Sequence, residues 1–207
     1  MQFTIPGRFL ASLCFATTSF AGTLALSPSG IADTTSSYTD TQGWSFTLSQ
    51  TVSVTALDYY DPSGANLAFS HQVGVWTSTG TLLFSTTIPS GAPGVTNGSY
   101  ESVAIAPYSL SPGNYVIGAT SASYSDLYVY YATAEPTISG VSFTGGGYIT
   151  YASGLNFPTP IGNNANPEFL SADFEVGTAQ SNTPTPEPST FVMLAGGMVF
   201  LWRRARG

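Results

Sequence analysis

The stretch Leu170-Ser171-Ala172-Asp173-Phe174-Glu175-Val176 decides the fold, because its apolar and polar residues alternate. Successive side chains of a β-strand point to opposite faces, so the apolar residues share one face and the polar residues share the other. This period of two predicts a strand, since an amphipathic helix would repeat its apolar positions every three to four residues.

The same alternation recurs upstream, where Trp44, Phe46 and Leu48 are separated by Ser45 and Thr47. It continues over residues 52–59 with a change of phase, which predicts a β-bulge near Ala56. Asp61-Pro62-Ser63-Gly64 and Ser78-Thr79-Gly80 are typical of turns. Further strands are predicted at residues 73–76, 81–87, 102–105, 115–120, 126–131, 137–143 and 147–151, the last two around a bend at residues 145–147.

About nine short strands without an amphipathic helix predict an all-β fold, an antiparallel β-sandwich or jelly roll. We assign residues 26–176 to this single domain and residues 177–185 to a flexible linker. Charged residues are only 7% of the chain, and residues 26–185 contain no Lys or Arg. Binding of nucleic acid by the domain is therefore not expected, because nothing there neutralises phosphates.

Residues 1–25 are predicted to be a cleaved signal peptide, with Arg8 before an apolar core. Two small-x-small sites leave cleavage after Ala21 and after Ala25 both open. Cys14, the single cysteine, lies in this segment, so the mature protein is expected to contain no disulfide.

The C-terminal segment, residues 186–207, has three parts: Pro186-Glu187-Pro188, the apolar run Phe191–Trp202, and the basic residues Arg203, Arg204 and Arg206. As a helix, the apolar run is roughly 18 Å long, against a bilayer core of about 30 Å. The prolines stop a helix from extending back into the domain. This short apolar helix is thus expected to anchor the chain in the membrane only transiently, beside an exposed motif. Its arginines are expected on the cytoplasmic side.

That three-part order resembles the PEP-CTERM sorting signal of Gram-negative bacteria. The resemblance implies an exported protein that is anchored transiently in the inner membrane and recognised by an exosortase, a membrane-embedded processing enzyme. Its destination would then be the cell surface, the outer membrane or the exterior. Whether the tail is removed or retained stays open.

The domain itself is similar to an uncharacterised secreted β-sandwich domain found in bacterial PEP-CTERM proteins. The residues that carry this similarity are strand and turn patterns, at residues 73–76, 80–83, 113–118 and 148–151. The resemblance implies a fold but no activity, and no functional residue is carried over from it.

The sequence contains few candidates for catalysis. His71 is the sole histidine, and no Gly-x-Ser-x-Gly motif presents a nucleophilic serine. Asp58 and Asp61 are the close carboxylate pair in the interior of the domain sequence, but within one strand and turn they do not straddle a sugar. We predict that the chain is not an enzyme and that His71 is a satisfied histidine at a strand edge.

Two kinds of binding site stay open as alternatives. Asp58, Asp61, Asp126 and Asp173 are hard oxygen donors, so they are candidate ligands for a structural Ca²⁺, although no EF-hand is present. Tyr128 and Tyr130 are candidates for a sugar-stacking platform, against the alternative that these tyrosines fill the core.

The leading interpretation is an exported surface or extracellular-matrix protein with a structural or adhesive role, processed by an exosortase. The first alternative is a carbohydrate-binding module that contacts an extracellular polysaccharide through exposed tyrosines, with Ca²⁺ as a stabilising ion. A glycan-active enzyme is the weaker alternative.

Overall fold

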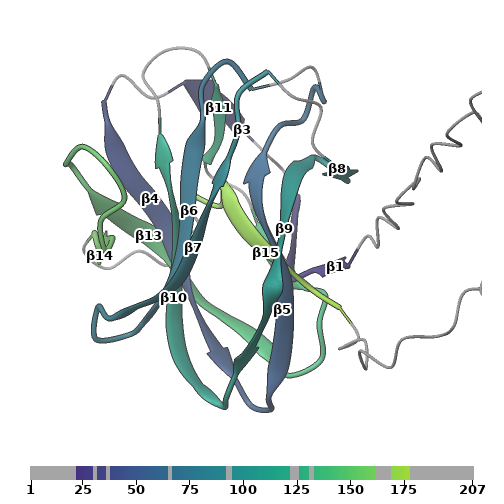
Figure 1. The fold of residues 1–207 in the computed structure, drawn as a ribbon. Helices are drawn as coiled ribbons and strands as arrows, with labels where there is room; N and C mark the ends of the chain where they lie inside the picture. The colour runs from purple at the N-terminus through teal and green to yellow at the C-terminus, as the bar shows by residue number, and fades with distance from the viewer. Residues whose placement is uncertain are drawn as a thin grey trace, which may run out of the picture.

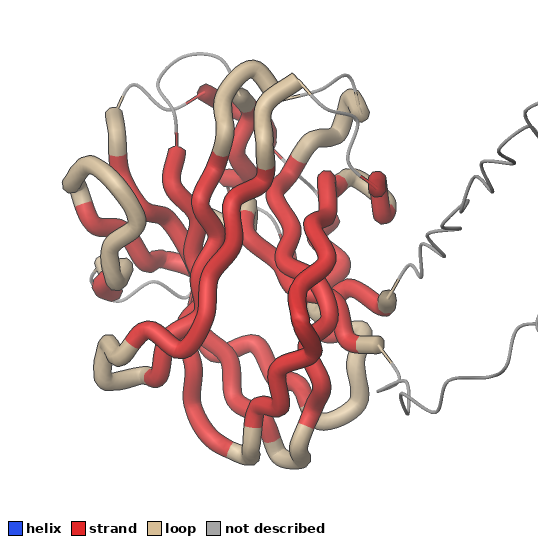
Figure 2. The backbone as a smooth tube through the Cα atoms, in the orientation of Figure 1, coloured by secondary structure: helices blue, strands red, loops and turns tan. Residues whose placement is uncertain are grey.

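The computed structural model describes residues 22–29, 32–35, 38–64, 67–91, 95–121, 126–130, 133–161 and 169–177. The predicted helix of the C-terminal segment and residues 1–21 of the predicted signal peptide lie outside these ranges. Within them every regular element is a strand, and no helix has the length and apolar character needed to cross a membrane (Figure 2).

Two antiparallel sheets form the body (Figure 1). The five-stranded sheet has the order β1 (Thr23–Leu24), β15 (Ala172–Val176), β5 (Val52–Tyr60), β9 (Tyr100–Leu110) and β8 (Val95–Asn97). The six-stranded sheet has the order β14 (Thr159–Pro160), β13 (Val141–Thr150), β4 (Asp40–Leu48), β10 (Gly113–Ser121), β6 (His71–Thr77) and β7 (Leu82–Ile88). Two short ribbons pair β11 (Leu127–Tyr130) with β3 (Ala32–Thr35) and β12 (Thr133–Pro136) with β2 (Leu26–Ser29). The predicted all-β antiparallel sandwich is confirmed.

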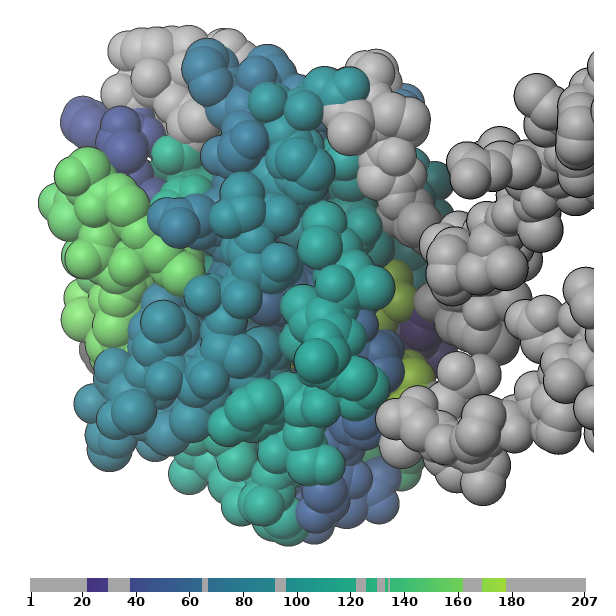
Figure 3. All heavy atoms as spheres, viewed as in Figure 1, coloured from purple at the N-terminus to yellow at the C-terminus, as the bar shows by residue number. Residues whose placement is uncertain are grey.

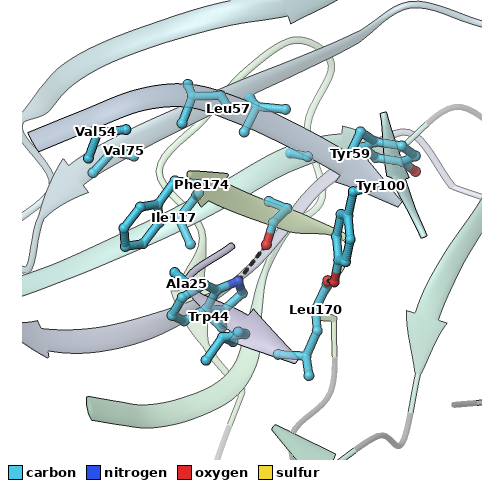
Figure 4. Close-up of a cluster of buried hydrophobic side chains, with 14 of the residues drawn as sticks. Ala25, Trp44, Val54, Leu57, Tyr59, Val75, Tyr100, Ile117, Leu170 and Phe174 are labelled. Carbon is cyan, nitrogen blue, oxygen red and sulfur yellow. Dashed lines mark hydrogen bonds between the residues drawn. The ribbon is translucent and has the colours of Figure 1, made fainter. Parts of the chain in front are cut away.

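The core lies between the two sheets and is rich in aromatic rings (Figure 4). Trp44 and Phe46 from β4 pack against Phe174 from β15, with ring centroids 6.2 and 5.1 Å from the Phe174 ring. The indole N–H of Trp44 donates to the carbonyl oxygen of Ala172 at 2.6 Å, which satisfies the one polar atom of that side chain. The alternating residues of the two predicted strands therefore meet as the centre of the sandwich.

Several local predictions are confirmed. The pairing of β5 with β9 shifts register between Val54 and Ala56, where the bulge was expected. Gly64 and Gly80 have φ values of 58° and 92°, so both predicted turns use a glycine in the left-handed region. At the first turn, Asp61 Oδ1 accepts hydrogen bonds from the backbone N–H groups of Ser63 and Gly64.

The predicted bend at residues 145–147 is wrong. Val141–Thr150 is a single strand, β13, whose pairing with β4 shifts register between Phe143 and Gly145 and again between Gly145 and Tyr148. Glycines tolerate the irregular backbone of a bulge as readily as that of a turn, so the sequence run was ambiguous.

The alternation of β15 holds, but its polar face is not exposed to solvent. Ser171, Asp173 and Glu175 are 2%, 0% and 3% exposed. Residues 22–26 pack against this strand: β1 pairs with it, and the N–H of Ala25 donates to the carbonyl oxygen of Phe174 at 2.9 Å. β1 lies N-terminal to residue 26, where the domain was predicted to begin.

Candidate functional site

His71 lies at the start of β6 and is fully buried. Its Nδ1–H donates to the carbonyl oxygen of Thr120 at 2.6 Å, and its Nε2 lies 2.9 Å from Asp126 Oδ2. The imidazole stacks on the Tyr59 ring with a centroid distance of 3.7 Å and an interplanar angle of 13°. Both ring nitrogens are therefore engaged within the protein, and neither is left to act as a general base on a substrate.

Asp126 also holds the backbone that leads into β6. Its Oδ1 accepts from the N–H of Ala68 at 2.7 Å, and its Oδ2 accepts from the N–H of Phe69 at 2.9 Å. Together with His71, these bonds tie the segment before β6 to the segment before β11. The sequence carried no signal for this pair, because 55 residues separate the two side chains and neither lies in a motif.

A second group of polar side chains is buried on the five-stranded sheet. Asp58 on β5 lies directly opposite Asp173 on β15, and Glu175 follows two positions later on the same face. Glu175 Oε1 accepts from Asn97 Nδ2 at 3.0 Å and from Ser102 Oγ at 2.9 Å. Asp173 accepts from the backbone N–H groups of Leu26 at 3.1 Å and Phe174 at 2.8 Å.

Asp58 differs from its neighbours because neither carboxylate oxygen has a hydrogen-bond partner among the described residues. Burial raises the pKa of Asp58 to about 7; the nearby Ser102 hydroxyl opposes the rise and the charge of Glu175 adds to it. Burial also raises the pKa of Asp173 well above its usual value, and the facing Asp58 adds to that rise. The two facing carboxyl groups thus form a coupled pair whose protonated forms are favoured by burial.

The four predicted Ca²⁺ ligands do not come together. Asp58 and Asp173 face each other, whereas Asp126 accepts bonds near His71 and Asp61 Oδ1 accepts from Ser63 and Gly64. In the described part of the chain, no three or more His, Cys, Asp or Glu side chains are grouped so as to hold a metal ion. The structure supplies no donor set for the predicted ion.

The predicted tyrosine platform is only partly within the described residues. Tyr128 is half-buried on β11, with its ring 5.8 Å from that of Phe169. Tyr130 ends β11 opposite Ala32, and its side chain is outside the described part. Two other tyrosines, Tyr59 and Tyr60 on β5, are buried in the core. The Tyr128 and Tyr130 platform stays a prediction.

A cleft of about 530 Å³ opens at the ends of β6, β7 and β10, and the sequence analysis missed it. Five large hydrophobic side chains are exposed in the described ranges, and three of them are aromatic: Phe69 at 47%, which belongs to the cleft lining, and Tyr38 at 62% and Tyr151 at 66%, which do not. Phe69 lines the cleft, and Tyr38 directly precedes the lining residue Thr39. The Tyr38 and Tyr151 rings meet edge to face at 5.5 Å. The sequence carried a partial signal, since Tyr38 lies outside every predicted strand, whereas Tyr151 ends the predicted strand at residues 147–151.

The comparisons with known proteins concern the tail. Residues 184–206 match the family model described as the PEP-CTERM protein-sorting motif. Neither the curated proteins nor the solved structures contain a match to the chain. The motif indicates a protein that is exported, held transiently in a membrane and sorted by an exosortase to the surface or the exterior. The similarity of the domain to a secreted β-sandwich family stays a prediction.

Proposed function

We propose that the chain is a non-catalytic surface or matrix protein with a structural or adhesive role, delivered to the outer surface of a Gram-negative cell by its C-terminal motif. The observation that carries the proposal is the match of residues 184–206 to the sorting motif, behind a domain of two packed sheets. An exosortase is the processing partner that this motif requires.

The chemistry of the domain favours a passive role. Both nitrogens of His71 are engaged inside the protein, and Asp58 is fully buried. A glycan-active enzyme needs two accessible carboxyl groups on either side of the scissile bond, and a buried pair on neighbouring strands does not meet that need.

The test is fractionation of the native host producing either the wild-type chain or a variant with Pro186, Glu187 and Pro188 all replaced by alanine. Wild-type protein is expected in the surface and extracellular fractions, and the variant in the inner-membrane fraction. A matched control replaces Ser181 and Thr183, which precede the matched residues 184–206, with alanine and is expected to leave the distribution unchanged. Equal distribution of variant and wild type would contradict a sorting role for Pro186-Glu187-Pro188.

The adhesive role has its own readout. Host cells without the gene are expected to lose surface attachment or matrix cohesion, and wild-type protein added back should restore it. A deletion strain with unchanged attachment and unchanged matrix would refute this role and leave sorting intact.

A further inference from the structure

The cleft beside Tyr38, Phe69 and Tyr151 is lined largely by uncharged polar side chains. The lining includes Thr39, Ser70, Gln72, Thr87, Thr120 and Ser121. Figure 3 shows the light-green segment 151–160 beside purple atoms from the start of β4, so distant parts of the chain meet at this face.

Two hydroxyl groups of the cleft, those of Ser70 and Thr120, are held in place by backbone N–H groups. Thr120 Oγ1 accepts from the N–H of Gln72 at 2.9 Å, and Ser70 Oγ accepts from the N–H of Ser90 at 3.0 Å. Each of these two oxygens is occupied as an acceptor, so its O–H is left to donate. The cleft therefore presents two positioned hydroxyl donors beside the exposed ring of Phe69.

We propose that this cleft binds a neutral saccharide chain. Aromatic faces pack against the C–H faces of pyranose rings, and fixed hydroxyl and amide groups bond to the sugar hydroxyls. An anionic polymer is disfavoured because residues 26–185 contain no Lys or Arg to pair with its charge. The inference rests on the proposed adhesive role and names the ligand class for it.

The test is calorimetric titration of the protein, purified from its host, with cellohexaose, mannohexaose and isomaltohexaose. At least one is expected to bind, and each of Tyr38→Ala and Tyr151→Ala should weaken binding roughly tenfold, the scale of losing one aromatic contact. Leu82→Ala is the control, because Leu82 is an exposed apolar residue, 47% accessible, at the opposite end of β7 from the lining residue Thr87. It should bind as the wild type does.

Three outcomes would contradict the proposal that the cleft binds a neutral saccharide. The first two are that no neutral oligosaccharide binds, or that only the anionic polymer alginate binds. The third is that Tyr128→Ala abolishes binding while the double variant of Tyr38 and Tyr151 does not. If the deletion strain loses attachment but no neutral sugar binds, the saccharide inference fails and the proposed function stands. If a neutral sugar binds but the deletion strain attaches normally, the adhesive role fails and the saccharide site stands.

A separate observation concerns the start of the mature chain. The backbone nitrogen of Gly22 lies 2.5 Å from Glu175 Oε2, and the next two residues form β1 against β15. A Cβ atom at position 22 would come within 2.7 Å of that same oxygen, so the approach requires glycine. Ala25 is fully buried in the core. Residues 22–25 are thus built into the domain.

The carboxyl group beside Gly22 lacks a cationic side chain. Glu175, the carboxyl group that contacts Gly22, is 3% exposed, and residues 26–185 supply no Lys or Arg to pair with it. Burying a carboxylate without a positive charge is strongly unfavourable.

We infer that signal peptidase cleaves between Ala21 and Gly22 rather than after Ala25. Water hydrolyses the Ala21–Gly22 amide: the new carboxylate leaves with the signal peptide, and the freed amine of Gly22 takes up a proton. That ammonium group then sits against Glu175 and provides the missing positive charge. Cleavage after Ala25 would instead remove β1 and the contact with Glu175.

N-terminal sequencing of the protein from its host tests this site, with Gly-Thr-Leu-Ala expected and Leu-Ser-Pro-Ser overturning it. A second readout is the rate of amine acylation at pH 7, which the ammonium contact with Glu175 should slow. Glu175→Gln is expected to speed acylation roughly tenfold, whereas Glu135→Gln, an exposed carboxyl on β12, should not. Equal rates in all three proteins would show that the amine does not pair with Glu175.

Discussion

Replacement of His71 with alanine is expected to lower the free energy of unfolding by roughly 3–5 kcal/mol, the cost of breaking a buried pair. The substitution removes the ring that stacks on Tyr59 and leaves Asp126 without its side-chain partner in a site where both side chains are nearly inaccessible. It also leaves the carbonyl oxygen of Thr120 without its donor. This effect is large because three separate contacts depend on one side chain.

Urea unfolding followed by tryptophan fluorescence gives the measurement. Gln72→Ala, at the exposed neighbouring position on β6, is the control and is expected to stay within about 0.5 kcal/mol of wild type. If His71→Ala fails to fold, His71→Gln should give a smaller, measurable loss because an amide can donate to Thr120. A loss of less than about 1 kcal/mol for His71→Ala would show that the contact between His71 and Asp126 contributes little to the stability of the fold.

Replacement of Asp58 with asparagine is expected to change how stability depends on pH. The folded-state pKa of Asp58 is raised from 3.8 to about 7, so the folded protein holds a proton there that the unfolded chain releases. The stabilisation that comes from this bound proton is complete below pH 4 and is lost progressively as pH rises from 4 to 7. Above the folded-state pKa the free energy of unfolding no longer changes through this group. Over that interval the loss is on the order of 4 kcal/mol, at about 1.4 kcal/mol per pKa unit.

The asparagine variant cannot ionise, so it escapes this loss. Relative to wild type, its free energy of unfolding should rise by several kcal/mol between pH 4 and pH 7, measured by urea unfolding at each pH. Asp61→Asn is the control, because Asp61 caps an exposed turn and no unpaired buried oxygen is involved. A constant difference between Asp58→Asn and wild type across this range would show that Asp58 is ionised in the folded protein at pH 4.

The strands could be predicted from the sequence because each sheet has one face against the core, which makes apolar and polar residues alternate. Trp44, Phe46 and Phe174 were assigned to apolar faces from alternation alone, and their rings do pack together. The failure at residues 145–147 has a simple origin, since glycine is used by both turns and bulges. The burial of Asp173 and Glu175 was not readable, because the residues that cover them come from the other end of the chain, at 22–26.

The candidate sites were harder to predict than the fold. His71 and Asp126 are brought together by the packing of strands that are not adjacent in sequence, so no spacing rule identifies them. The cleft beside Tyr38 and Tyr151 joins residues more than one hundred positions apart. The tail is the opposite case: its motif, apolar run and arginines are contiguous, and residues 184–206 match the sorting motif as expected.

The central claim is that the tail is a detachable sorting signal for the domain. The intact mass of the mature protein from its own host tests it most directly, because the mass locates the C-terminus once N-terminal sequencing has fixed the other end. We predict a C-terminus near Pro188, with the apolar run and the arginines removed. A mass that retains Arg206 would contradict this claim and show that the tail is a permanent anchor.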